Sequence, residues 1–436
     1  MIPPSDSAPA AVPAEVPAEL RADVAVIGGG VIGHGIAWEA RRSGRSVVLI
    51  DDAPGSGASW AAAGMLAPVS ELHYQEEGLL ELMLESSGLW PAFAADLARA
   101  AQCGTGYVAT PTLAIGADAA DRRALMDLRA VQQANGLEVE PLTVREARTR
   151  EALLSPAISC ALDIPADHQV DPRKLVGCLR QVLAAHQEGA GSAVEGAHDG
   201  FAIADRATSL VWEDGRVSGV RLAGGGSVAA EETVVANGLQ AASLEGLPDG
   251  LRLPLRPVYG DILRLRVPHH LRPLVTSTVR GLVHGVPVYI VPRQDGTVVI
   301  GATQREDALA ATGPEHGKDR AGVSAGGVYQ LLRDAQALLP AVAELELVES
   351  TARARPATPD NAPLLGRVRS AGSQAQVAGL IVATGFFRHG VLLTPAAAAI
   401  CRDLMDGTED PRWLPFTPSR FSGGHPATLQ STKESA

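Results

Sequence analysis

The residues with the clearest chemical spacing stand near the start of the chain. Gly28, Gly30 and Gly33 form a G-x-G-x-x-G pattern, and Asp51 follows Gly28 by 23 residues. The three glycines suit, in order, a tight turn, a close backbone approach to a pyrophosphate and close helix–strand packing. A carboxylate at this distance can accept hydrogen bonds from an adenosine ribose. The spacing predicts a dinucleotide site, and it does not distinguish NAD from FAD.

These glycines need particular elements around them. The apolar run Asp23–Ile27 predicts a buried parallel strand, residues Val31–Ser43 a helix, and Ser46–Ile50 a second strand. The N-terminus of that helix would offer free N–H groups and a positive dipole end to phosphates. The stretch is therefore typical of the first βαβ unit of a Rossmann-like domain.

Composition limits the class of protein. The 436 residues are 46% hydrophobic and 20% charged, with a net charge of -12. An acidic surface disfavours binding to nucleic acid, and no apolar run has the length of a membrane span. Four scattered cysteines without a C-x-x-C pair argue against a zinc site or a disulfide framework, so we expect no metal and a cytoplasmic protein. Residues 1–20 and 416–436 look like a disordered leader and tail.

The remaining pattern mixes two textures. Amphipathic helices are expected at residues 78–102, 119–135, 173–185 and 323–339. Strands are expected around residues 107–115, 208–238 and 379–385, and alternating, antiparallel-looking strands fill residues 253–302. An insertion is expected at 188–204. We therefore predict an α/β protein whose nucleotide domain is assembled from separated pieces and joined by a β-rich second domain.

Four further blocks make a family resemblance specific. They are GASWAAAGML at 57–66, VYIVPRQDGTVVIGAT at 288–303, ARARPATPDNAPLLG at 352–366 and ATGFFRHGVLLTPA at 383–396. With VIGGGVIG at 26–33, they resemble the D-amino-acid-oxidase superfamily of FAD-dependent oxidoreductases, and within it the glycine oxidases of thiamine biosynthesis. The resemblance covers roughly residues 22–415.

The resemblance implies a domain division and a cofactor. Residues 21–100, 161–252 and 346–415 would form a Rossmann-like FAD-binding domain of the D-amino-acid-oxidase type. Residues 101–160 and 253–345 would form a second, mostly antiparallel β, substrate-binding domain. The block at 352–366 contains no cysteine, so a covalent flavin link is not expected there and FAD would be bound non-covalently.

The resemblance also implies site residues. Arg355 would hold a substrate carboxylate with its planar fork, Tyr289 would donate its O–H to the same group, and Arg388 would occupy a third substrate or flavin position. Arg353 shares a strand face with Arg355, so the sequence leaves open which of them holds the carboxylate. Arg388 has the alternative of a structural ion pair, and the role of His389 is undecided. The expected FAD contacts are Gly28, Gly30, Val31, Ile32, Gly33, Asp51, Asp52, Ala58, Ser59, Ala63, Gly64, Met65, Thr208, Gly385, Phe386, Phe387, Arg388, His389, Gly390, Val391 and Leu392.

The implied activity is oxidative deamination of glycine or a similar small amine to an oxo acid, ammonia and H2O2, with O2 as electron acceptor. A D-amino-acid or sarcosine oxidase or dehydrogenase of the same superfamily is the main alternative. The oxidase half of a tRNA-modifying protein is disfavoured by the acidic balance. A non-catalytic NAD-binding module would leave the flavin-side blocks without a purpose. The protein is a possible homo-oligomer.

Overall fold

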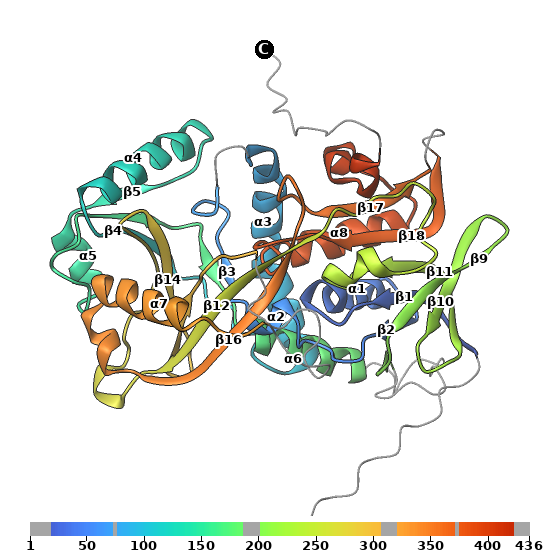
Figure 1. Cartoon of the computed structure of the whole chain (residues 1–436), viewed down its shortest axis with the longest axis horizontal. Helices are drawn as coiled ribbons and strands as arrows, with labels where there is room; N and C mark the ends of the chain where they lie inside the picture. Colours follow the sequence, from blue (N-terminus) through green and yellow to red (C-terminus); the bar gives the residue numbers. More distant parts are fainter. Residues whose placement is uncertain (1–18, 73–75, 186–200, 307–320, 371–374, 423–436) are drawn as a thin grey trace, which may run out of the picture.

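The computed structural model describes residues 19–72, 76–185, 201–306, 321–370 and 375–422. Most of the predicted leader, most of the predicted insertion at 188–204 and residues 423–436 of the predicted tail lie outside these ranges. Two eight-stranded sheets lie side by side, with helices packed around them (Figure 1). The prediction of an α/β protein is confirmed.

The first sheet has a parallel centre, in the order β17-β18-β11-β1-β2-β8, and β10 and β9 extend it by pairing with β11 and with each other. The C-terminal parts of its central strands are buried apolar residues, because helices cover one face and loops and the β9–β10 hairpin pack on the other. The strands are β1 (Glu19–Ile27), β2 (Val47–Ile50), β8 (Ala202–Ile203), β9 (Ala207–Glu213), β10 (Arg216–Leu222), β11 (Ser227–Val235), β17 (Leu364–Arg369) and β18 (Gln376–Thr384).

The second sheet runs β16-β12-β15-β14-β13-β4-β6-β5, and all its pairings except β13 with β4 are antiparallel. The prediction of a mostly antiparallel second sheet is confirmed. Its strands are β4 (Thr112–Gly116), β5 (Glu140–Leu142), β6 (Cys160–Ile164), β12 (Arg256–Arg266), β13 (Thr278–Val283), β14 (Val286–Pro292), β15 (Thr297–Gly301) and β16 (Glu346–Ala357). A separate two-stranded pair joins β3 (Met65–Leu66) to β7 (His168–Gln169).

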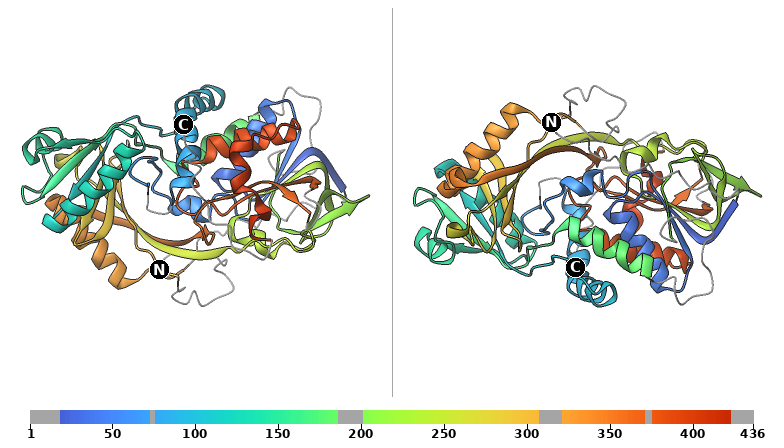
Figure 2. Two further views of the ribbon diagram at one scale, coloured as in Figure 1. Left: turned by 90° about the horizontal axis from the view of Figure 1, so that it is seen from above. Right: turned by 90° about the horizontal axis from the view of Figure 1, so that it is seen from below.

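Helices contribute much of the buried core beside the first sheet, and a helix also packs against the second sheet. Residues of α1, α3, α6 and α8 share one buried cluster against the first sheet, and residues of α7 belong to the buried cluster of the second sheet. Figure 2 shows these helices beside their sheets. The helices are α1 (Val31–Arg42), α2 (Ala58–Ala61), α3 (Leu80–Ala101), α4 (Ala119–Ala134), α5 (Val144–Arg150), α6 (Pro172–Ala185), α7 (Ala325–Leu338) and α8 (Thr394–Met405). The 3-10 helices are η1 (Glu77–Leu79), η2 (Gly238–Ser243), η3 (His269–Leu271), η4 (Pro340–Glu344), η5 (Pro411–Phe416) and η6 (Pro418–Phe421).

Several local predictions need correction. Residues 107–110 are not a strand, because only Val108 forms a bridge, to Gln169. The predicted tail begins too early: residues 416–422 are ordered, Phe416 is buried, and the Arg420 guanidinium binds the Asp360 carboxylate. The first two residues of β1 fall in the predicted leader. The division into domains stays a proposal, and strand pairing puts β6 and β16 in the second sheet rather than with the FAD-binding segments.

The cysteine prediction also needs correction. Cys103, just after α3, forms a disulfide with Cys178 in α6, and their Cα atoms are 6.2 Å apart. Cys160 and Cys401 are free and buried. The spacing of cysteines along the chain did not reveal the pair, because the two positions meet only through the packing of α3 against α6. None of the helices in the described part of the chain is long and apolar enough to cross a membrane.

Candidate active site

A cavity of about 880 Å³ runs between the first sheet and the second. Its wall contains every predicted site residue except Gly33. Gly33 instead faces the glycine turn, where an added Cβ would lie 1.9 Å from the Gly28 carbonyl oxygen. Its role is therefore the close helix–strand packing that the motif implies, without direct contact with the cavity.

The glycine turn closes one end of the cavity. Gly28 has φ +110°, which a side chain would strain, and its N–H donates to the Ile50 carbonyl at 2.9 Å. An added Cβ on Gly30 would approach only the Ser59 Oγ, at 3.4 Å, so this backbone is open to a ligand. The arrangement is a cradle that narrow phosphate groups can enter.

Asp51 is fixed by the same turn. Its Oδ2 accepts the Gly29 N–H at 2.5 Å and its Oδ1 accepts the Ala53 N–H at 2.7 Å. Burial raises the pKa of Asp51, and these two hydrogen bonds oppose the rise. Each carboxylate oxygen keeps lone pairs beyond its backbone bond, so Asp51 is positioned to accept from a ribose hydroxyl.

The small-residue segment after the turn forms a second wall. The Ser59 Oγ accepts the Val31 N–H at 3.0 Å, which ties α2 to the start of α1. Gly64 has φ +75°, and an added Cβ would lie 2.0 Å from the Val170 carbonyl oxygen. Arg293 donates to the carbonyls of Ala63 and Val170, and burial lowers the pKa of Arg293 to about 10. Sequence reasoning did not single out Arg293, which fixes the segment that contains Gly64.

The FFRHG block lies on the other side of the cavity, from which it leads into α8. Gly385 and Phe387 have positive φ values of 72° and 47°, and the Phe387 N–H donates to the Pro356 carbonyl at 2.8 Å. The block is thereby joined to the end of β16. The Ser86 Oγ of α3 accepts a hydrogen bond from the Ala396 N–H at 3.2 Å, so it satisfies one of the N–H groups that have no partner within the first turn of α8.

Tyr289 and Arg355 meet at the second sheet. The Arg355 guanidinium acts electrostatically on the Tyr289 phenol, and burial raises the pKa of Tyr289, so the phenol is protonated near neutral pH. Both side chains depend on glycines that sequence reasoning missed. A Cβ added to Gly260 would lie 2.5 Å from Arg355 Nη2, and a Cβ added to Gly301 would lie 2.4 Å from the Tyr289 hydroxyl. No carboxylate among the described residues forms an ion pair with Arg355.

Arg353 lines the same cavity but has different partners. Its Nε donates to the Ser56 carbonyl at 3.0 Å, and its Nη1 donates to the Thr351 hydroxyl at 3.0 Å. Ser56 belongs to the loop that follows Asp51. Arg353 therefore supports the nucleotide end, whereas Arg355 lies beside Tyr289.

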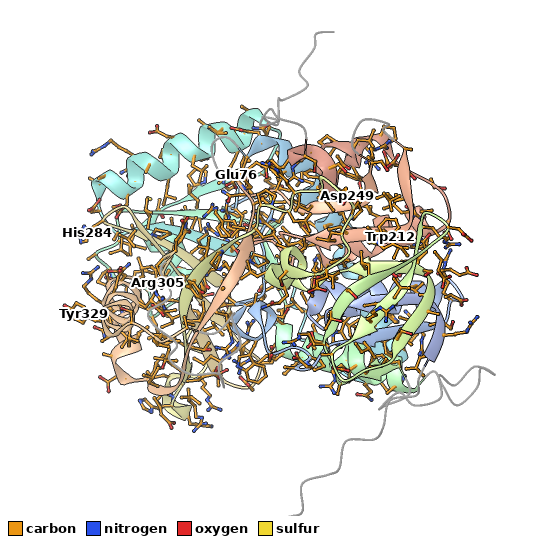
Figure 3. All side chains as sticks on the ribbon, turned by 45° about the vertical axis from the view of Figure 1, so that its right-hand side comes forward. Glu76, Trp212, Asp249, His284, Arg305 and Tyr329 are labelled. Carbon is orange, nitrogen blue, oxygen red and sulfur yellow. A yellow bond between two sulfur atoms is a disulfide. The ribbon has the colours of Figure 1, made fainter. Side chains whose placement is uncertain are left out.

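Arg388 forms the structural ion pairs that the sequence left open as an alternative. Its Nε lies 2.9 Å from Glu71 Oε2, and its Nη2 is paired with Glu76. Glu71 is also paired with Arg280 through its other oxygen. Glu71 and Arg280 line the cavity and were not predicted, whereas Glu76, which Figure 3 labels, is not among the residues that line it. No regular motif connects these residues, so the sequence held no signal for them.

Three other predicted or considered residues are placed as follows. Thr208 is half-buried at the adenosine side, and its hydroxyl donates to the Arg221 carbonyl at 3.2 Å. His389 is buried, with its backbone N–H donating to Phe386 and its carbonyl accepting from Leu393. His34 is buried in α1 beside the Gly30 carbonyl, at 3.0 Å, and burial lowers the pKa of His34 to about 4.

The cavity fits FAD. Its open glycine backbone and Asp51 suit the adenosine diphosphate end, while the small residues at 58–64 and the block at 385–392 leave a flat slot for the ring system. Tyr289 and Arg355 line the same cavity from β14 and β16 of the second sheet, whereas Asp51 follows β2 of the first.

Comparisons with known proteins agree with this geometry. Residues 23–404 match the model of the family described as FAD dependent oxidoreductase. A glycine oxidase of Geobacillus kaustophilus is 34% identical over 92% of this chain and 98% of its own. The bifunctional protein ThiO/ThiG of Trichormus variabilis is 31% identical over 92% of this chain, which spans only 55% of that protein.

Solved structures show the same relationship. The crystal structure of glycine oxidase from Geobacillus kaustophilus matches with a TM-score of 0.77 and 32% identity, covering 92% of this chain and 99% of that one. The predicted fold, of the D-amino-acid-oxidase type, is confirmed. The chain belongs to the FAD-dependent oxidoreductase family of D-amino-acid oxidase, and its cofactor is FAD.

Proposed function

We propose that the protein oxidises glycine or a similarly small amine. With glycine, one molecule each of glycine, O2 and water would give one each of glyoxylate, ammonia and H2O2. The observation that carries the proposal is the Arg355–Tyr289 pair, a cation with no carboxylate partner in the described part of the chain beside a protonated phenol. A substrate carboxylate is the group that this pair would complete.

The chain's own residues would bind and orient the substrate. The Arg355 fork would hold the carboxylate through two parallel hydrogen bonds, and Tyr289 would donate a third. Residues 385–392 and the small residues near Gly64 would hold the ring. Bound FAD would supply the chemistry, by accepting two electrons from the amine-bearing carbon. We assign no general base, and the roles of Arg388 and His389 in contact with FAD or substrate remain proposals.

The relatives support the proposal. Proteins named glycine oxidase align with this chain over nearly its full length. A role in thiamine biosynthesis is proposed from the resemblance to that group and from the relative named ThiO/ThiG. Use of O2 as acceptor, a cytoplasmic location and assembly as a homo-oligomer are further parts of the proposal.

The direct test is a substrate panel. The FAD-loaded protein should release H2O2 with glycine and with sarcosine or D-alanine at comparable or lower rates. Turnover of bulky D-amino acids without turnover of glycine would contradict the substrate proposal and favour the D-amino-acid alternative. Reduction of the flavin without H2O2, and with an added quinone as acceptor, would instead make the protein a dehydrogenase.

A further inference from the structure

The carboxylate of Glu71 forms ion pairs with two arginines in the part of the cavity that contains Tyr289 and Arg355. Glu71 Oε1 is paired with Arg280, and Glu71 Oε2 lies 2.9 Å from the Arg388 Nε. The Glu71 side chain is only 11% exposed, so water screens these contacts weakly. All three residues line the same cavity as Tyr289 and Arg355.

The strand register puts this cluster next to the substrate pair. Arg280 of β13 is the direct cross-strand partner of Tyr289 of β14, so their side chains share one face of the second sheet. Glu71 and Arg280 both act electrostatically on the Tyr289 phenol, as Arg355 does. A substrate whose carboxylate is held by Arg355 would therefore extend its other substituents near this cluster.

The backbone holds Glu71 in place. The buried Asp167 accepts the N–H groups of Val69 and Ser70, each at 2.9 Å, and the Glu71 N–H donates to the Ala67 carbonyl at 3.1 Å. The turn before Glu71 is thus anchored from below. These bonds fix the backbone at Glu71, and the ion pairs with Arg280 and Arg388 hold its side chain in the cavity wall.

The charges at this end then fall into two groups. Arg355 has no carboxylate partner among the described residues, whereas Arg280 and Arg388 share Glu71, and Arg388 has Glu76 as well. A first carboxylate finds a free fork at Arg355. A second carboxylate would meet guanidinium groups that are already paired, and a buried carboxylate that repels it.

We propose that Glu71 determines the substrate class of this pocket, by restricting it to amines with a single carboxylate. Arg280 and Arg388 would form a second carboxylate site if Glu71 were neutral. The inference rests on the proposed function for the place of the first carboxylate at Arg355. It goes further in assigning the selectivity to a residue that need not take part in the oxidation.

The test uses two carboxylates that cannot be oxidised as amines. Acetate and malonate are titrated into the FAD-loaded protein, and binding is read from the change in the visible spectrum of the flavin. In the unaltered protein acetate should bind more tightly than malonate. In Glu71→Gln the ratio of the malonate Kd to the acetate Kd should fall at least about tenfold, since one charge-assisted hydrogen bond or more becomes available to malonate.

Glu76→Gln is the matched control. It also removes a carboxylate from Arg388, but Glu76 does not line the cavity, and Glu71 would still be paired with both arginines. Because Glu71 would still repel a second carboxylate, the malonate-to-acetate ratio should change less than about threefold. Glu71→Ala provides a second version of the test if the glutamine variant does not bind FAD.

Three results would overturn the inference: tighter binding of malonate than of acetate by the unaltered protein, an unchanged ratio in both Glu71 variants, or an equal shift in Glu76→Gln. The first of these needs no variant at all. The titration also needs no turnover, so its outcome is independent of the proposed activity. If the Kd ratios are as expected but the protein does not oxidise glycine, the proposed activity is contradicted and the proposed role of Glu71 in selectivity still stands.

Discussion

Replacing Arg355 by alanine should weaken substrate capture without loss of FAD. The guanidinium stands beside Tyr289 and has no carboxylate partner in the described part of the chain, so its fork is available to a substrate carboxylate. Each charge-assisted hydrogen bond contributes about 1.5–3 kcal/mol. Loss of two such bonds, partly replaced by water and Tyr289, should cost about 3–4 kcal/mol, or roughly 150- to 900-fold in kcat/KM for glycine.

Gly260→Ala perturbs the same group without removing its charge. The new Cβ would lie 2.5 Å from Arg355 Nη2, so the end of the arginine must shift. We expect a loss of about tenfold in kcat/KM, mostly through KM. The assay is the initial rate of H2O2 release over a range of glycine concentrations with FAD saturating, and FAD content is measured from the visible spectrum.

Arg353→Ala is the control, because its Nε binds the Ser56 carbonyl at the nucleotide end. It should change the KM for glycine less than about threefold. An unchanged KM in Arg355→Ala, together with a large rise in Arg353→Ala, would refute the assignment and give the carboxylate role to Arg353.

Two further predictions concern the cofactor and the fold. Glu349 accepts two hydrogen bonds from the Arg173 guanidinium, at 2.9 and 2.7 Å, and these hold Arg173 over the Trp60 ring of α2. Glu349→Gln should therefore raise the Kd for FAD about 5- to 30-fold (about 1–2 kcal/mol), measured by the fluorescence of released FAD. An unchanged Kd would show that these contacts do not hold α2 against the cofactor. Burial lowers the pKa of His34 to about 4 in the folded state, so between pH 6.5 and 4 the unfolded state binds more protons than the folded state. The stability that neutral His34 contributes is therefore fully present above pH 6.5 and is lost as the pH falls toward 4. Between pH 7 and pH 5 this loss should be about 2 kcal/mol in denaturant unfolding, and His34→Gln should lack it; an equal loss in the variant would contradict the role of His34.

The nucleotide end could be predicted from sequence because its signals are local. The glycine spacing, the helix after it and Asp51 lie within one βαβ unit, and the structure shows each in the predicted element. The hydrophobic pattern also identified the two kinds of sheet. The pattern did not predict that β16 and β6 belong to the second sheet, because strand pairing depends on partners far along the chain.

The substrate end could be predicted only in part. Family motifs singled out Tyr289, Arg355 and Arg388, but Glu71 and Arg280 are 209 residues apart and belong to no common motif. Gly260 and Gly301 look like ordinary strand glycines until the register places a side chain over each. Cys103 and Cys178 similarly meet through helix packing. Local patterns predict elements and motifs, whereas the charges around a pocket follow from the tertiary fold.

Anaerobic mixing with glycine is the most direct test of the proposed activity. The FAD-loaded protein is mixed with glycine in the absence of O2, and the yellow flavin absorbance is followed over time. Glycine should bleach this absorbance, and glyoxylate should form in an amount equal to the flavin reduced. A flavin that stays oxidised with glycine, sarcosine and D-alanine, while other amines reduce it, would contradict the proposed activity.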